Sequence, residues 1–494
     1  MKTIYNSIIV LFIILVGCND ELTRDPIGLL TIDQVDTTPT LIGLETSIRS
    51  SYEPLGSTLN SIFGGWDWTG GTVFRNDIIL QDIAANDMNK KWSPDGDQAW
   101  MDEVSFFNFT SENPAFNGIW AYNYEGINRV NFGISLLTNN ETVQFVGMSE
   151  TRKNQLLGEA YFLRSFYYFD LINNFGNVPV LLTPLQSFQE AFEVAVNVPV
   201  SEVLAQINSD LSEAKKLLPN TKYPDPSDKS RVSKGAVIAL QAKVAVHYGN
   251  DWGSVLNLIA ELDALAFYSL NTNYFDSFDA SKEFTDNEVI FAYDHRSGEV
   301  PNRGNGLAAV SGWGFFAPTE NFINAFEPND PRLLYTVDVA NQHVSKILGS
   351  TIDYKGNDNS PGNRIFIRYA DVLLWKAEAL NENGDYPGAI AIINQIRARA
   401  RTSPTADGST IPAGTLVDRP NSTNPSQIKD WLMSERRVEL GFESQRFNDL
   451  KRWKTAKTVL TDLGKSFQDH NYLYPIPQRD IDKSGGTITQ NTNY

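Results

Sequence analysis

Two alanine-rich segments that resemble each other constrain the fold more than any other feature of this 494-residue chain. The first is "AVIALQAKVAVHYGNDWGSVLNLIAEL", beginning at Ala236, and the second is "ADVLLWKAEALNENGDYPGAIAIINQI", beginning at Ala370. They align at one constant offset, with Leu240 opposite Leu374 and Ala245 opposite Ala379. Each has the spacing of a helix, a tight turn and a second helix. The chain therefore predicts at least two similar helical hairpins.

The layout of these hairpins is that of a tetratricopeptide-type unit. Small alanines allow two helices to approach closely, and the aromatic residue after each turn, Trp252 or Tyr386, closes the open end of the pair. Two earlier helical segments, residues 117–137 and 152–175, are candidates for degenerate copies. We expect a scaffold of four such units. The alternative interpretation is a general likeness between helical hairpins, because only two copies are clear.

Other segments predict further elements of this scaffold. Helices are expected around residues 40–55 and 201–218, with Ser201 as the N-cap of the second. A strand is expected at residues 287–294, "NEVIFAYD". Two stretches, about 62–107 and 270–366, are instead rich in Gly, Asp, Asn and aromatic residues without sustained periodicity. We interpret them as loop insertions, which commonly carry binding residues.

The N-terminus indicates export and lipidation. Lys2 precedes an apolar run at residues 8–16, which is shorter than the roughly 20 residues that a membrane-spanning helix requires. Residues 1–17 therefore predict a signal peptide. The order "LVGC" resembles a bacterial lipobox, and Cys18, the single cysteine, is the expected acylation site. The alternative is an ordinary signal peptide with an incidental cysteine. Residues 18–39 would form the lipidated N-terminus and tether, and residues 40–494 a single domain.

Charge and composition exclude several classes of function. The formal net charge of −18 repels phosphate backbones, which argues against nucleic acid as a partner. One cysteine excludes an internal disulfide framework and a cysteine-cluster metal site. The histidines lie far apart, and no familiar catalytic motif is present. We expect no cofactor, apart from a possible calcium ion in the Asp/Asn-rich residues 354–362.

A charged segment near the C-terminus, "SERRVELGFESQRFNDLKRW" at residues 434–453, alternates arginines and carboxylates at steps of three or four. On one helix these charges would alternate in sign along a face. Interleaved apolar residues suggest that some ion pairs are partly buried. Because each carboxylate has an arginine neighbour that holds it ionised, we favour a structural network over catalysis.

This segment resembles the signature of the SusD/RagB family, the surface glycan-capture lipoproteins of Bacteroidetes. Other stretches are similar to the family in the same order along the chain: "CNDELTRDP", "GEAYFLRSFYYFDLINNFGNVPV", "FEPNDPRLLYT", "IRYADVLLWKAEALNENGD" and "YLYPIPQRDIDKSGGTITQN". Two departures are that Ser444 stands where glycine is usual and that the loop after "DPR" is short.

The resemblance implies a mostly α-helical SusD-like fold, with four tetratricopeptide-like helix pairs, long irregular insertions and a few short strands. It implies a non-catalytic lipoprotein on the outer face of the outer membrane, anchored in lipid through acylated Cys18. Such proteins are similar in role to a hinged lid over a TonB-dependent transporter of the SusC type. They pass captured glycan to that transporter.

No family motif fixes the ligand site, so we predict it from chemistry. Flat aromatic rings take the C–H faces of a neutral sugar, and amides or carboxylates take its hydroxyl edges. The loop tryptophans are the candidates: Trp66, Trp68, Trp92, Trp100 and Trp313. We expect Trp92, Trp100 and Trp313 to form one stacking arc, since they lie in two facing insertions. The remaining tryptophans, Trp120, Trp252, Trp375, Trp431 and Trp453, are expected in the core.

Two alternatives to glycan capture stay open from the sequence. The same scaffold captures peptides in part of the family, although the loops show no apolar groove pattern. A glycoside hydrolase would need two carboxylates roughly 5–10 Å apart across a cleft, and nothing marks such a pair. Which glycan is recognised does not follow from the sequence.

Overall fold

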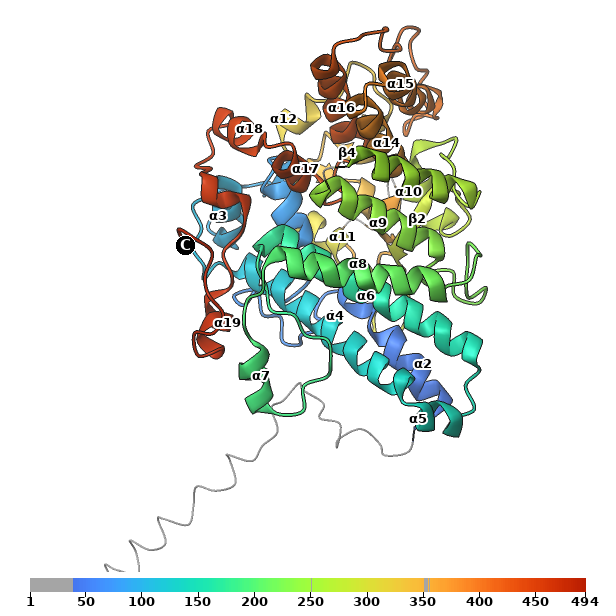
Figure 1. Cartoon of the computed structure of the whole chain (residues 1–494). Helices are drawn as coiled ribbons and strands as arrows, with labels where there is room; N and C mark the ends of the chain where they lie inside the picture. The colour runs from blue at the N-terminus through green and yellow to red at the C-terminus, as the bar shows by residue number, and fades with distance from the viewer. Residues whose placement is uncertain (1–38, 250, 351–353, 355) are drawn as a thin grey trace, which may run out of the picture.

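The computed structural model describes residues 39–249, 251–350, 354 and 356–494, and its body is a stack of helices (Figure 1). The stack proceeds through helices that pack on one another in chain order, with few short strands. Its members are α4 (Pro114–Thr138), α6 (Glu150–Phe175), α8 (Val200–Leu217), α9 (Lys234–Tyr248), α10 (Trp252–Ala264), α14 (Tyr369–Glu382), α15 (Tyr386–Thr402) and α16 (Pro425–Glu439). The prediction of a mostly helical protein is confirmed.

The two predicted hairpins are present as α9–α10 and α14–α15. Each second helix has an aspartate as its N-cap. The Asp251 side chain accepts from Gly253 N at 2.9 Å, and the Asp385 side chain accepts from Gly388 N at 3.0 Å. Alanines that face the core, such as Ala239 and Ala377, are buried. Helix α10 packs on α14, so the two hairpins are neighbours in space although an insertion separates them in sequence.

The two earlier helical segments are present as α4 and α6, which pack on each other. Helix α4 is capped by Asn113 and α6 by Ser149, and Gly176 with φ 72° ends α6. A β-carbon at Gly126 would lie 2.3 Å from the Tyr167 ring, so glycine permits the close crossing of α4 and α6. The predicted N-cap of α8 is wrong, because Pro199 occupies that position and Ser201 lies within the first turn.

Short strands connect the insertions to each other and to the scaffold. Strand β2 (Val289–Tyr293), which lies within the predicted segment, pairs antiparallel with β6 (Arg364–Arg368). Strand β1 (Met88–Asn89) pairs antiparallel with β3 (Ala317–Pro318), with Met88 opposite Pro318. Because β1 belongs to the first insertion and β3 to the second, the two insertions face each other as predicted. A third pair joins β4 (Val337–Asp338) and β5 (His343–Val344).

The charged C-terminal segment is not one helix. Helix α16 ends at Glu439, and a separate α17 (Arg446–Arg452) follows. Phe442 with φ 63° and Ser444 with φ 55° break the helix between them, because left-handed residues cannot continue a right-handed helix. A left-handed residue is least costly as glycine, which is why glycine suits the position that Ser444 fills. The Ser444 amide donates to Asp82 Oδ2 at 3.1 Å, which helps to hold it there.

Shorter helices complete the described chain. They are α2 (Leu41–Ser50), η2 (Glu53–Leu55), η3 (Ile79–Ile83), α3 (Ala99–Phe106), α5 (Asn140–Phe145), α7 (Phe188–Val194), η4 (Tyr274–Ser277), η5 (Ala280–Lys282), α11 (Leu307–Gly312), α12 (Glu320–Ile323), α13 (Arg332–Thr336), η6 (Lys346–Leu348), α18 (Ala456–Asp462), η7 (Asp469–Tyr472) and α19 (Gln478–Lys483). Within the described ranges, no helix combines the length and the apolar character needed to cross a membrane.

Candidate functional site

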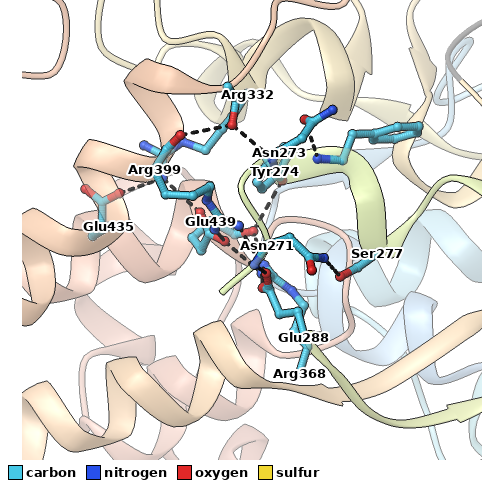
Figure 2. A network of polar contacts seen from close by, with 12 residues as sticks. Asn271, Asn273, Tyr274, Ser277, Glu288, Arg332, Arg368, Arg399, Glu435 and Glu439 are labelled. Atoms are coloured by element: carbon cyan, nitrogen blue, oxygen red, sulfur yellow. Dashed lines mark hydrogen bonds and ion pairs between the residues drawn. The ribbon is translucent and has the colours of Figure 1, made fainter. Parts of the chain in front are cut away.

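A buried ion-pair network surrounds Glu439, the last residue of α16 (Figure 2). Its carboxylate accepts from Arg332 Nη1 at 3.0 Å, from Arg368 Nη1 at 2.8 Å and from Arg399. These arginines come from α13, β6 and α15, which lie far apart in the sequence. Glu439 therefore joins the C-terminal segment, the hairpin α14–α15 and the second insertion at one point.

The network keeps the Glu439 carboxylate ionised. Burial alone would raise the pKa of Glu439, but the guanidinium groups of Arg399, Arg368 and Arg332 hold it well below its usual value. In the same way Arg436 and Arg452 lower the pKa of buried Asp449. A carboxylate held so firmly as an anion is a poor proton donor or acceptor near neutral pH. The segment is thus held by buried ion pairs, as the structural interpretation predicts.

The network also fixes the start of the second insertion. The Tyr274 hydroxyl donates to the backbone oxygen of Glu439 at 3.3 Å (Figure 2). The backbone N–H of Asn271 donates to Glu288 Oε2 at 3.1 Å. Glu288 in turn accepts from Arg368 Nη1 at 2.5 Å. The network therefore anchors the start of the second insertion, which carries Trp313 further along the chain.

Three tryptophans from the two insertions meet in what we call the tryptophan patch: Trp66, Trp68 and Trp313. The Trp313 ring lies 6.4 Å from the Trp66 ring at an interplanar angle of 49°, and 6.3 Å from the Trp68 ring at 64°. Trp66 is 52% exposed and Trp313 is 41% exposed, whereas Trp68 is half-buried and packs on Phe315 at 5.6 Å. The patch thus has an embedded ring with two exposed rings beside it.

Local backbone contacts set the direction of these rings. Trp66 has φ 53°, and its amide donates to Asn60 Oδ1 at 3.1 Å. The following turn is closed by Asp67, whose carboxylate accepts from Gly70 N at 2.7 Å. Trp313 is the C-cap of α11, with its amide bonded to Ala309 O at 2.9 Å. Each exposed ring is therefore carried by a fixed backbone, which reduces the entropy lost when a ligand binds.

Trp92 lies beside the patch on a loop that a buried lysine holds. It is 59% exposed, and a β-carbon at Gly314 would lie 2.4 Å from its Cζ3, so the ring covers the residue after Trp313. Lys90 Nζ donates to Asp95 Oδ1 at 2.7 Å and to Asp102 Oδ2 at 2.8 Å. These bonds tie the loop that presents Trp92 to the first turn of α3.

Trp100 does not join the expected arc with Trp92 and Trp313. It is 8% exposed and packs in the main hydrophobic core, with its indole N–H bonded to Gln98 Oε1 at 2.7 Å. Residues 99–106 form α3 rather than a loop, and this helix buries the ring. Trp66 and Trp68 take the neighbouring positions around Trp313 instead. That any of these tryptophans binds a ligand stays a prediction.

Other predicted features have varied outcomes. Trp120, Trp375 and Trp453 are buried as expected, whereas Trp252 and Trp431 are half-buried. Cys18 and the predicted signal peptide lie outside the described residues. No group of three or more His, Cys, Asp or Glu side chains is arranged to hold a metal ion in the described part of the chain. Calcium at residues 354–362, where Lys355 is not described, stays a prediction.

Comparison with known proteins identifies the class. Residues 335–494 match the model described as the SusD family, and residues 64–246 match one described as "Starch-binding associating with outer membrane". The chain belongs to the SusD/RagB family.

Individual relatives agree with that assignment. SusD-like protein P2 of Formosa agariphila is 26% identical over the full length of both chains. A laminarin-binding SusD-like protein has a TM-score of 0.71 at 23% identity, covering 92% of this chain and 100% of its own. Surface glycan-binding protein A from Bacteroides thetaiotaomicron, in complex with laminarihexaose, has a TM-score of 0.70 at 20% identity. The match covers 92% of this chain and 100% of that chain. The fold is therefore SusD-like, as the sequence predicts.

Proposed function

We propose that this protein captures oligo- or polysaccharide at the cell surface and delivers it, without cleaving it, to a TonB-dependent outer-membrane transporter of the SusC type. The observation that carries the proposal is the tryptophan patch, in which two insertions bring exposed indole rings together on fixed backbone. The SusD-like fold agrees with this role, and the structural relatives named above include proteins described with laminarin and laminarihexaose.

The patch suits sugar faces for a physical reason. Indole rings offer broad apolar surfaces that pack against the C–H faces of pyranose rings, and their exposure leaves those surfaces free for a ligand. The rings of Trp66 and Trp313 are inclined to each other by 49° rather than parallel. A saccharide chain that bends between successive residues would contact both rings more fully than a flat ribbon.

Non-catalytic capture is consistent with the electrostatics of the family signature. Its buried carboxylates are committed to ion pairs with arginines, as Glu439 and Asp449 illustrate. Attachment through an acylated Cys18 would place the protein at the outer membrane, in agreement with the family description of outer-membrane association. We expect the anchor to face the cell exterior, where the transporter receives glycan.

Native gel retardation of the purified protein through a panel of neutral and acidic polysaccharides, laminarin among them, tests the proposal. Retardation by at least one glycan is expected, and a reducing-end assay on that glycan should detect no cleavage. Calorimetry with oligopeptides runs in parallel. Heat from peptides without retardation by any glycan would replace glycan capture with peptide capture, and new reducing ends would indicate a hydrolase.

A further inference from the structure

A second concave site lies outside the tryptophan patch, and we call it the arginine cleft. It is lined by Arg49 at the end of α2, by Arg231 just before α9, and by Arg296 and Arg303 after β2, and its cavity volume is about 80 Å³. A neighbouring hollow shares Ser230, Arg231 and Ala292 with it and adds Lys222 and Lys229. Together the two hollows form a strip of cationic side chains.

The charge of this strip differs from that of the whole protein. The chain carries a formal net charge of −18. Yet the cationic residues that line the arginine cleft outnumber its carboxylates, which are Glu53, Asp228 and Asp294. In the neighbouring hollow two lysines face Asp286. Glu159 and Glu299 also pair with arginines of the cleft, so an anionic ligand is favoured by the N–H donors that these arginines keep free rather than by net charge.

The carboxylates of the cleft already have partners. Glu53 is paired with Arg129 Nη1 at 2.6 Å, from outside the cleft. Asp228 accepts from the Ser230 hydroxyl at 2.5 Å, and Asp294 is paired with Arg296 Nε at 2.6 Å. These contacts lower the repulsion that an incoming anion would meet.

The guanidinium groups retain donors. Arg49 is 60% exposed at its side chain, and its pair with Asp228 is long at 3.4 Å. Arg303 lies 3.7 Å from Glu299. The Nη2 of buried Arg231 has no hydrogen-bond partner among the described residues. A guanidinium group offers five N–H donors, so these arginines have capacity for a ligand.

The base of the cleft is preorganised. The Nε of Arg231 lies 2.6 Å from Glu159 Oε2, which holds the side chain in place. The guanidinium group lies over the Tyr52 ring, 5.1 Å from its centroid. Arg303 lies over the Tyr293 ring at 5.7 Å. Stacked and paired arginines lose little freedom when they bind, which favours bidentate recognition of oxyanions.

We propose that the arginine cleft binds a carboxylate or sulfate group carried by a saccharide. The small cavity of about 80 Å³ suits an oxyanion substituent better than a whole sugar ring. That the ligand is a saccharide rests on the proposed function. The anion itself follows from the cleft.

Matched polymer pairs test this proposal, because each pair keeps the backbone and removes the charge. The pairs are dextran sulfate with dextran, and polygalacturonate with its methyl ester. The purified protein should bind the acidic member more tightly in at least one pair, and the preference should weaken as salt is raised. Equal affinity for both members in both pairs would overturn the proposal.

A double variant locates the effect. Arg49→Gln with Arg303→Gln should lower the affinity for the acidic polymer by about tenfold or more, since two charge-assisted contacts are lost. The control, Arg401→Gln with Arg479→Gln, removes the same charge from partly exposed arginines elsewhere and should have little effect. An equal loss in the control, or equally tight and cleft-dependent binding of poly-L-glutamate, would contradict a saccharide oxyanion site.

The two proposals fail in different ways. If Trp313→Ala abolishes binding of a neutral glycan while no acidic polymer binds preferentially, the cleft proposal fails and glycan capture at the patch stands. If acidic polymers bind through the cleft but tryptophan variants change nothing, the patch loses its assigned role and the cleft stands.

Discussion

The ion-pair network around Glu439 and the tryptophan patch use side chains in opposite ways. In the network, charged groups are inside: Glu439 is 0% exposed and contacts guanidinium groups from three elements. In the patch, large apolar rings are outside, at 52% exposure for Trp66 and 41% for Trp313. The residues that mark the family therefore hold the scaffold, and the exposed rings proposed to contact ligand lie in insertions beyond that signature.

The largest expected effect breaks the network. Glu439→Gln leaves three buried arginines short of a counter-charge, and removal of one partner from a buried ion pair costs about 3–5 kcal/mol. We expect the midpoint of urea unfolding to fall markedly. Glu382→Gln is the control, because Glu382 pairs with Lys429 at the surface and such pairs contribute about 0–1 kcal/mol. Similar midpoints for the two variants would show that the network contributes little to the free energy of unfolding.

The next effect concerns the patch. Trp313 contacts both Trp66 and Trp68, so Trp313→Ala should weaken glycan binding more than Trp66→Ala. Loss of one stacking platform should reduce affinity by about tenfold. Calorimetry with the glycan found by gel retardation measures both variants. The unfolding midpoint should change little for Trp66→Ala, whose ring is half-exposed. A larger effect of Trp66→Ala than of Trp313→Ala would show that the rings are ranked wrongly.

More of the helical scaffold than of the tryptophan patch could be predicted from the sequence. Alanine spacing and the aspartates at Asp251 and Asp385 report local helix and turn preferences, so the hairpins followed from the sequence. The break between α16 and α17 depends on Asp82, which holds Ser444 from far along the chain. The burial of Trp100 depends on α3, whose residues resemble the surrounding loop in composition. Such long-range contacts leave no local pattern in the sequence.

A smaller effect sharpens the position of Trp92. Gly314→Ala places a methyl group 2.4 Å from the Trp92 ring at a residue with φ 89°, so the ring must move. If Trp92 contributes to the ligand surface, glycan affinity should fall by a few-fold, roughly 1 kcal/mol. Trp92→Ala removes the ring altogether, so its loss of glycan affinity is the largest expected from this position. Unchanged affinity in both variants would remove Trp92 from the binding surface.

The last expected effect is a pH dependence that arises outside the network. Burial, together with Asp294, raises the pKa of Glu283 to about 8, against the lowering by Asn363 N–H and Arg296. Because the folded state holds this proton above the ordinary pKa of 4.5, the free energy of unfolding should decrease as pH rises from 4.5 to about 8. Glu439 has the opposite sign, since its lowered pKa makes stability fall only at acidic pH.

Thermal unfolding of the wild-type protein and of Glu283→Gln between pH 5 and 9 measures this dependence. The variant should show a flatter decline of the unfolding temperature toward pH 8. Glu150→Gln, at an exposed pair with Lys153, is the control and should follow the wild type. A parallel decline in all three proteins would assign the pH dependence to other groups.

The central claim is that the scaffold and the ligand surface are separable parts of this molecule. The most direct test is native gel retardation of the double variant Trp66→Ala Trp313→Ala through the glycan that retards the wild type, with urea unfolding measured on the same sample. We predict that retardation is lost while the unfolding midpoint stays close to that of the wild type. Retained retardation would contradict the claim and place glycan binding elsewhere on the protein.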